Sequence, residues 1–174
     1  RLAMRDGARV QGLVRTEASA RRLRAAGVQA LVADLDEELA DLPAADKVLI
    51  ASPPQQHGDT DARMARILRA LPVPQRLVYI STSGVYGDCQ GQWVDETRAP
   101  NPSTPRAIRR VDAERQLAAW AQSTSVSLCC LRVPGIYGPG RLPFQRLQGE
   151  YASGDIDEVL HLARDVKTDV VALQ

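Results

Sequence analysis

Short apolar runs alternate along the chain with stretches in which apolar residues recur every three or four positions. The runs predict strands that are buried on one or both faces, at residues 8–14, 28–34, 47–52, 76–82 and 126–133. Between the first two runs lies TEASARRLRAAG, in which Thr16 or Ser19 could cap a helix and Gly27 could end it. The pattern therefore predicts a strand–helix–strand unit at the start of the chain.

Two further helices are predicted between the later strands. The segment 57–72 places Met64, Ile67, Leu68 and Leu71 on one face, and the prolines that follow end it. A longer helix is expected over 104–123, with Thr104 as N-cap and Pro105 at the first helical position. Strands that alternate with helices predict an α/β fold with a doubly wound, parallel, Rossmann-like sheet.

The two ends of the chain carry weaker patterns. RLAMRDGA is typical of the last turns of a helix that Gly7 closes, and we expect a strand and a turn upstream of it. Near the other end, Asp155 and Glu158 could cap an amphipathic helix whose apolar face runs to Leu173. The expected division is a Rossmann-like domain over residues 1–150 and an amphipathic helix over 151–174.

Composition narrows the class of protein. With 174 residues, 44% of them hydrophobic, the chain suits one globular domain, and its net charge of +1 gives no reason to expect nucleic acid or an anionic membrane as partner. No apolar run approaches the roughly 20 residues of a membrane span, and the first residues lack the core of a signal peptide, so a cytoplasmic protein is expected. Three cysteines without CxxC spacing and two distant histidines argue against a metal site.

The residues that end each strand are the first candidates for a binding site, because ligands bind at the carboxyl ends of parallel strands. Arg15 follows the first run, where an arginine suits the extra phosphate of NADP, although an ordinary surface arginine would look the same. Asp34 could accept from an adenine amino group or cap a helix. Ser52 and Pro53 begin a stretch that allows close backbone approach to a ligand, or forms a plain loop.

Two motifs and the helix between them carry a family resemblance. The fourth run ends in STSGVYG (81–87), and the fifth continues as RVPGIYGPG (132–140). Over roughly residues 1–150 the chain resembles the extended short-chain dehydrogenases/reductases, the NAD(P)-dependent epimerases and dehydratases. The resemblance implies a dinucleotide-binding domain with Thr82 at the substrate hydroxyl. It also implies that Val133, Pro134 and Gly135 pass the nicotinamide, and that 151–174 is the remnant of a substrate region.

The same resemblance exposes a departure in the long helix. Arg106 and Arg110 fall where the family has its catalytic Tyr and Lys, while Glu114 keeps the family's acid. A guanidinium, whose pKa is above about 12, cannot relay protons at neutral pH, but its planar fork of donors suits phosphates and carboxylates. We therefore predict an anion-binding role for both arginines. A solvated helix face is the alternative, because like charges four residues apart share one side of a helix.

These observations leave two functional hypotheses. The first is an NAD(P)-binding oxidoreductase or epimerase-like protein with altered acid/base residues, with NADP favoured over NAD and a small polar or sugar-nucleotide substrate. The second is a non-catalytic NADP-binding sensor or partner-binding module. A Gly-rich turn that binds the pyrophosphate would have to lie upstream of Arg1. The resemblance also allows a homodimer, because the helix that holds Arg110 represents part of the pair of helices through which subunits of the family associate.

Overall fold

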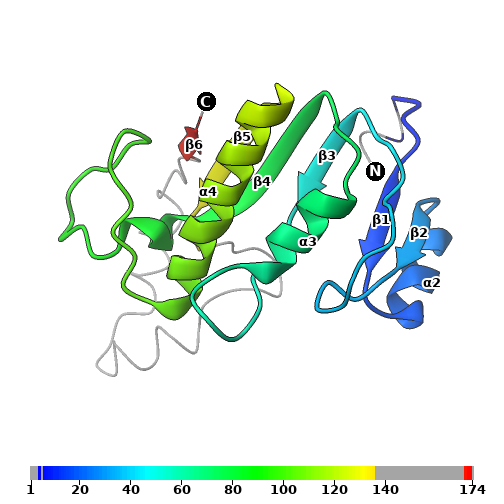
Figure 1. Ribbon diagram of the computed structural model, residues 1–174, viewed down its shortest axis with the longest axis horizontal. Coiled ribbons are helices and arrows are strands. Elements are labelled where there is room, and N and C mark those ends of the chain that lie inside the picture. The colour runs from blue at the N-terminus through cyan, green and yellow to red at the C-terminus, as the bar shows by residue number, and fades with distance from the viewer. Residues whose placement is uncertain (1–3, 5, 136–170, 174) are drawn as a thin grey trace, which may run out of the picture.

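The computed structural model describes residues 4, 6–135 and 171–173, which form two sheets of mainly parallel strands with helices packed against them (Figure 1). Strands β1 (Gln11–Val14) and β2 (Gln29–Val32) pair in parallel, and helix α2 (Glu17–Ala25) connects them. The side chain of Thr16 caps α2 by accepting a hydrogen bond from the amide of Ser19 at 3.2 Å. The predicted strand–helix–strand unit is confirmed, with Thr16 as its N-cap.

The larger sheet contains four strands in the order β3–β4–β5–β6. Strands β3 (Lys47–Ile50), β4 (Arg76–Thr82) and β5 (Ser127–Val133) are parallel. Helix α3 (Ala62–Ala70) connects β3 to β4, and the short 3₁₀ helix η1 (Ser83–Tyr86) and helix α4 (Pro105–Thr124) lie between β4 and β5. The predicted Rossmann-like α/β class is confirmed. The described strands form two sheets rather than one, because β1 pairs only with β2 among them and β3 only with β4.

The C-terminal prediction is wrong where it can be compared with the structure. Residues Val171–Leu173 form strand β6, antiparallel to β5, and Leu173 lies opposite Cys130 in the register. An apolar run such as VVAL fits a strand as well as a helix, and here the edge of β5 provides backbone partners. Residues 151–170 of the predicted helix lie outside the described residues.

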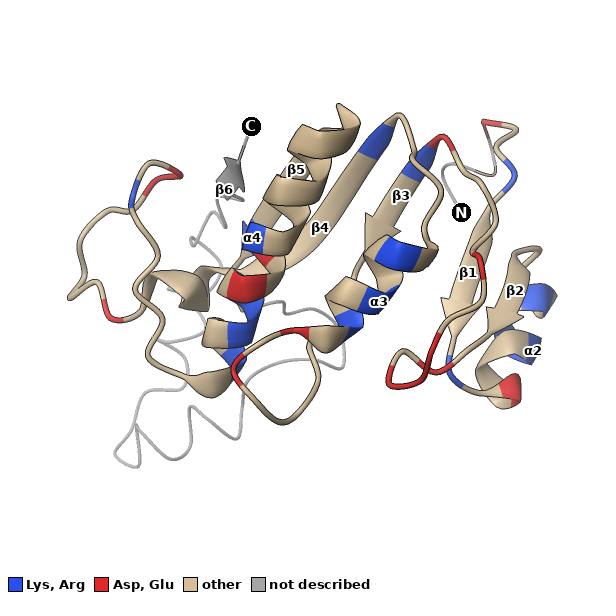
Figure 2. Cartoon of the chain, in the orientation of Figure 1, with Lys and Arg blue, Asp and Glu red and all other residues tan. Residues whose placement is uncertain are grey.

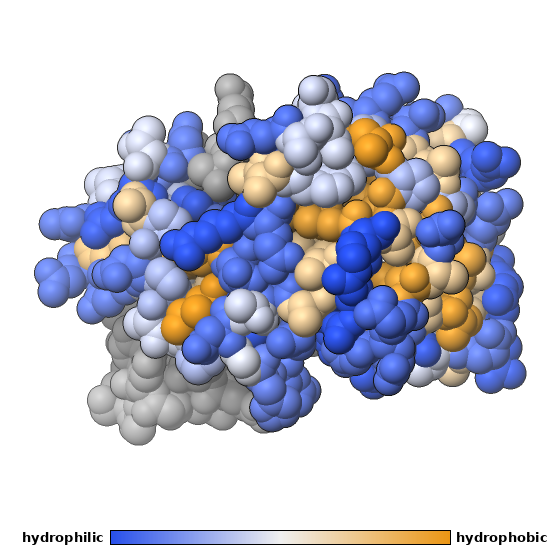
Figure 3. Space-filling view, in the orientation of Figure 1, coloured by the Kyte–Doolittle hydropathy of each residue, from blue (hydrophilic) through white to orange (hydrophobic). Residues whose placement is uncertain are grey.

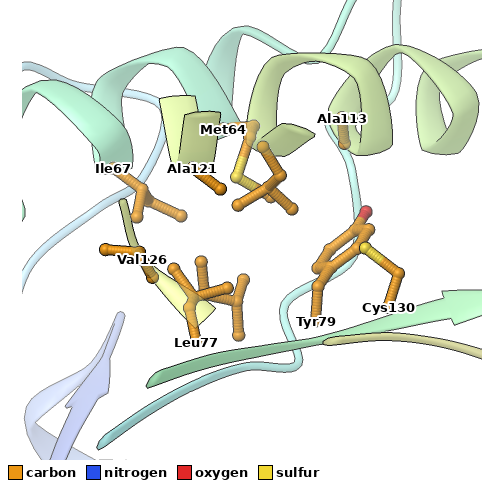
Figure 4. Packing of buried hydrophobic residues seen from close by; sticks show 10 residues of the cluster. Met64, Ile67, Leu77, Tyr79, Ala113, Ala121, Val126 and Cys130 are labelled. Atoms are coloured by element: carbon orange, nitrogen blue, oxygen red, sulfur yellow. The ribbon is translucent and has the colours of Figure 1, made fainter. Parts of the chain in front are cut away.

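The main hydrophobic core lies between the four-stranded sheet and helices α3 and α4, which cover the same face of it (Figures 1 and 4). Leu77 and Tyr79 of β4 are completely buried against Ala113 and Leu117 of α4. Alternate residues of a strand point to the same face, so Ser81 also faces α4 and is buried. On the face shown in Figure 3, hydrophobic surface gathers over α3 and the β1–β2 unit.

Helix α4 carries charged residues on its buried face. Thr104 caps it as predicted, accepting from the amide of Ala107 at 3.3 Å, and Pro105 is its first residue. Arg110 and Glu114, four residues apart, lie on the same side as Leu117, since residues at this spacing share a helix face. The face that holds Arg110 therefore points toward the sheet.

Candidate functional site

A cavity of about 390 Å³ lies where the carboxyl ends of β1 and β3 meet the first turns of α3 and α4. The sequence predicts this position, because parallel strands present their carboxyl ends at one edge of the sheet. Ligand pockets of enzymes are commonly of about this size. Arginines are prominent in the lining, which consists of Arg15, Pro53, Pro54, Gln55, Gln56, Arg63, Arg106 and Arg109.

The cavity brings together three residues that were predicted for the site. Arg15 comes from the end of β1, Pro53 from the loop after β3, and Arg106 from the first turn of α4. Figure 2 shows basic positions in the first turns of α4 and along the whole length of α3. Arg15 and Arg106 are solvent-exposed, so both guanidinium groups are accessible to a ligand. Their roles stay predictions.

Arg63 lines the cavity and was not found from the sequence. Its Nε and Nη2 donate to the two carboxylate oxygens of Asp36 at 2.7 and 2.6 Å. Its Nη1 donates to the carbonyl of Pro53 at 3.1 Å. The fork fixes the loop after β3 against the loop after β2, and the hydrogen bond from Arg63 lowers the pKa of Asp36. The two residues are 27 positions apart, and no local pattern marks such a pair.

Arg109 also lines the cavity, although it is only 6% exposed. Its Nη1 donates to the carbonyl of Gly58 at 2.7 Å, whereas its buried Nε has no hydrogen-bond partner. No described carboxylate forms an ion pair with it. Its spacing of three residues from Arg106 is the signal that could have found it, because both side chains then lie on the same edge of α4.

Arg110 is placed differently from Arg106. It is 5% exposed, and its Nη1 donates to the carbonyl of Ser52 at 3.1 Å and to the hydroxyl of Tyr79 at 2.7 Å. Its guanidinium carbon lies 5.3 Å from the centre of the Tyr79 ring. The structure thus holds Arg110 on neutral acceptors, between the end of β3 and the middle of β4, and the lining of the cavity does not include it.

Tyr79 does not supply the proton relay that the family's tyrosine would provide. The phenol is completely buried, and this burial raises its pKa to about 12, against a smaller lowering by Arg110. A phenol with a raised pKa stays protonated at neutral pH and cannot act as a base there. Its hydroxyl also accepts the hydrogen bond from Arg110. Tyr79 and Arg110 therefore form a structural contact in the core.

A second buried polar cluster lies at the ends of β4 and β5. Glu114 of α4 accepts from the hydroxyl of Ser81 at 2.5 Å and from Nη2 of Arg132 at 2.7 Å. The guanidinium carbon of Arg132 lies 4.7 Å from the centre of the Tyr86 ring. These residues tie β4, α4, β5 and η1 together, and they fix the segment that carries Thr82.

Thr82 and the segment after β5 lie side by side. Thr82 pairs with Val133 in the parallel register, and Pro134 and Gly135 follow directly. The hydroxyl of Thr82 accepts from the amide of Gly84 at 3.2 Å, which caps η1. The residues predicted to contact substrate and nicotinamide are therefore brought together, and their roles stay predictions. Ile136 and the rest of the motif lie outside the described residues.

The remaining predicted residue, Asp34, closes a turn after β2. Its Oδ1 accepts from the amide of Asp36 at 3.0 Å, which leaves its other carboxylate oxygen without a described partner. Asp34 is not part of the cavity lining, although Asp36 holds Arg63 in that lining. An adenine contact by Asp34 stays a prediction.

The described part of the chain can be searched for metal sites and for membrane-spanning helices. No group of three or more His, Cys, Asp or Glu residues there could hold a metal ion. None of the described helices is long and apolar enough to cross a membrane.

Parallel strands with a cavity at their carboxyl ends place the chain among Rossmann-like α/β proteins. Within that class the chain belongs to the NAD dependent epimerase/dehydratase family, whose model matches residues 55–171. It is 31% identical to the protein YeeZ of Escherichia coli (strain K12) over 163 residues, which cover 84% of this chain and 57% of YeeZ. The chain therefore spans little more than half the length of that relative.

Solved structures give the same fold. A conserved protein of unknown function from Silicibacter pomeroyi DSS is 31% identical, with a TM-score of 0.65 over 84% of this chain and 51% of its own. The UDP-glucuronic acid 4-epimerase from Bacillus cereus in complex with NAD superposes with a TM-score of 0.63 at 19% identity, covering 87% of this chain and 58% of the epimerase. At that identity the second likeness shows the fold alone.

Proposed function

We propose that this chain provides the nucleotide-binding part of an NADP-binding oxidoreductase or epimerase-like protein that acts on a small polar or sugar-nucleotide substrate. The observation that carries the proposal is the arginine-lined cavity at the carboxyl ends of β1 and β3. Membership of the NAD dependent epimerase/dehydratase family supports a nicotinamide cofactor. The complex of the Bacillus cereus epimerase with NAD supports it as well.

The residues of the cavity fit a phosphorylated nucleotide. Arg15 is exposed at the end of β1, where an arginine is placed to meet a 2′-phosphate. Pro53 and Pro54 provide an apolar wall, and Arg109 contributes a guanidinium with an unpartnered Nε. In this proposal Arg15 selects NADP, and Asp34 and Ser52, which follow β2 and β3, lie near the nucleoside.

The chemical step would take place beside Thr82 and Val133. A bound nicotinamide would exchange a hydride with the substrate. Thr82 would hold a substrate hydroxyl, and the backbone from Val133 to Gly135 would pack against the ring and exclude water. Arg106 and Arg110 cannot move the substrate proton, because a guanidinium keeps its proton at neutral pH. Any proton transfer would have to use another group.

Calorimetry with NADPH and NADH tests the proposal. We expect the protein to bind NADPH more tightly than NADH, and Arg15→Ala to reduce this difference by about 1–3 kcal/mol, the scale of a hydrogen bond to a charged group. Arg21→Ala, which removes an exposed arginine of α2 outside the cavity, serves as the matched control. Equal affinity for both cofactors, unchanged by Arg15→Ala, would remove Arg15 from the site.

A second candidate is a non-catalytic NADP-binding sensor or partner-binding module. The observation that favours it is the position of Arg110, whose guanidinium is occupied by the Ser52 carbonyl and the Tyr79 hydroxyl. The double variant Arg106→Tyr, Arg110→Lys discriminates the two candidates, because it restores a titratable phenol with a neighbouring ammonium. Hydride transfer by the double variant, with none by the parent, would favour the sensor. Hydride transfer by the unmodified protein would favour the first candidate, the oxidoreductase or epimerase-like enzyme.

A further inference from the structure

The arginines that line the cavity are not balanced by carboxylates. Four arginines line it, Arg15, Arg63, Arg106 and Arg109, and no acidic residue is part of the lining. Only Arg63 has an ion pair with a described residue, namely Asp36. The cavity therefore presents an excess of positive charge to whatever enters it.

Arg109 is the most informative of the four. Burial of a cation without a paired anion is costly, and buried charges in proteins are normally paired or fully hydrogen-bonded. Arg109 is 6% exposed, yet it has a single described acceptor, the carbonyl of Gly58, and its Nε has none. Asp61 is also buried, but its carboxylate accepts from the amide of Met64 and caps α3. A counterion for Arg109 is thus missing among the described residues.

We propose that Arg106 and Arg109 form a phosphate-binding subsite in the first turns of α4. The two residues are three positions apart on one helix, so their side chains lie on the same edge and can hold one anion between them. The planar fork of a guanidinium matches the oxygens of a phosphate, and the low exposure of Arg109 strengthens its attraction for an anion. The site differs from the sequence-based pair Arg106 and Arg110, because Arg110 is bound to neutral acceptors in the core.

The chemistry of this subsite allows two sources for the phosphate. It could belong to the nicotinamide cofactor, or it could belong to a phosphorylated substrate such as a sugar nucleotide. A cavity of about 390 Å³ is larger than one phosphate group needs, so the anion would be part of a larger molecule. The subsite shares the cavity with the proposed cofactor, but its evidence does not depend on cofactor binding.

Inorganic pyrophosphate is the probe for the experiment. Its affinity is measured by calorimetry at low and high salt for the parent chain and for Arg106→Gln, Arg109→Gln and Arg109→Lys. We expect the two Gln variants to bind pyrophosphate at least tenfold more weakly. Arg109→Lys, which keeps the charge, should retain part of the affinity, and added salt should reduce the difference between parent and Gln variants.

Arg115→Gln is the matched control, because Arg115 is an exposed arginine of the same helix outside the cavity lining. It should bind pyrophosphate like the parent. Circular dichroism and the melting temperature establish whether each variant is folded. If Arg109→Gln does not fold, then Arg106→Gln and Arg109→Lys decide the result, since Arg106 is exposed.

Repeating the titration with saturating NADPH identifies the source of the phosphate. Competition between NADPH and pyrophosphate assigns the subsite to the cofactor, and binding of both together assigns it to the substrate. The proposal is overturned if the parent does not bind pyrophosphate, or if the folded Gln variants bind it as the parent does. NADPH binding that survives this result would leave the proposed function intact. Pyrophosphate binding without NADPH binding would overturn the proposed function instead.

Discussion

Arg132 and Glu114 form an ion pair in the interior, with Nη2 and Oε2 2.7 Å apart and with side chains that are 5% and 8% exposed. Glu114 also accepts from Ser81, and Arg132 stacks on the ring of Tyr86. The pair therefore connects β4, β5 and α4 next to the residues predicted for the site. Loss of one partner would leave the other as an uncompensated buried charge.

We predict that Glu114→Gln lowers the free energy of unfolding by about 3 kcal/mol, because it removes the charge partner of buried Arg132. Denaturation with urea measures the change. Glu17→Gln is the control: it breaks the exposed pair with Arg24, and should cost less than about 1 kcal/mol. Equal effects of the two substitutions would show that the buried pair contributes no more than a surface pair.

The stability of the protein should fall in alkaline solution because of Tyr79. Burial raises the pKa of Tyr79 from 10.0 to about 12, so between these pH values the unfolded chain releases a proton that the folded protein keeps. The stabilisation by the neutral phenol is present below pH 10 and is lost as the pH rises toward 12. We expect a loss on the order of 2 kcal/mol across this window.

Tyr79→Phe checks the assignment. The variant lacks the titrating hydroxyl, so its free energy of unfolding should depend less on pH between 10 and 12. At neutral pH it should be less stable than the parent by about 1–3 kcal/mol, because Arg110 loses one of its two acceptors. An unchanged alkaline pH profile in Tyr79→Phe would assign the loss to another group.

Thr82 combines a structural role with its predicted role at the substrate. Its hydroxyl caps η1 through the amide of Gly84, so Thr82→Val should cost about 1 kcal/mol of stability. The same variant should weaken binding of ligand or slow turnover. Thr82→Ser keeps the hydroxyl and should retain both properties. Normal ligand binding by a folded Thr82→Val protein would limit the residue to its capping role.

Two glycines of the loop between η1 and α4, residues 87–104, provide a matched test of backbone packing. Gly87 has φ 69°, and a Cβ there would lie 2.2 Å from the carbonyl oxygen of Asn101. Gly91 has φ 73°, but a Cβ there would meet nothing within 4 Å. Gly91→Ala should therefore cost about 1 kcal/mol for the left-handed conformation alone. Gly87→Ala should cost clearly more, as measured by thermal unfolding.

The sequence predicts those strands and helices whose pattern of apolar residues and caps lies within one continuous stretch. The run RLVYIST coincides with β4, and α4 begins one residue after the predicted cap Thr104. The partition of the strands into two sheets could not be predicted, because pairing depends on which strands meet in space. The C-terminal helix failed at residues 171–173 because a short apolar run is ambiguous between helix and strand.

The candidate site was predictable only where a strand end or a motif marks it. Arg15, Pro53 and Arg106 were identified by position and do line one cavity. Arg63 was missed because its partner Asp36 is distant in sequence. The different environments of Arg106 and Arg110 could not be predicted from the sequence either. The two arginines are one helical turn apart on α4, yet Arg106 is exposed and Arg110 is buried. This difference depends on how closely each turn of α4 packs against the sheet, which no local pattern shows.

Two hydrogen bonds to its neighbours hold the loop between η1 and α4 (residues 87–104). The hydroxyl of Tyr86 donates to the carbonyl of Asp95 at 2.9 Å, and the amide of Asn101 donates to the carbonyl of Val85 at 2.9 Å. Trp93 lies between η1 and the hydrogen bond at Asp95, and it is 94% exposed. Cys89 and Val94 pack against the buried cluster of Val85, Tyr86 and Val111, whereas Gln92 and Trp93 are exposed. Insertions and substitutions at Gln92 and Trp93 should therefore leave the rest of the loop in place, so that related proteins can vary this tip without disturbing the buried pair of Glu114 and Arg132.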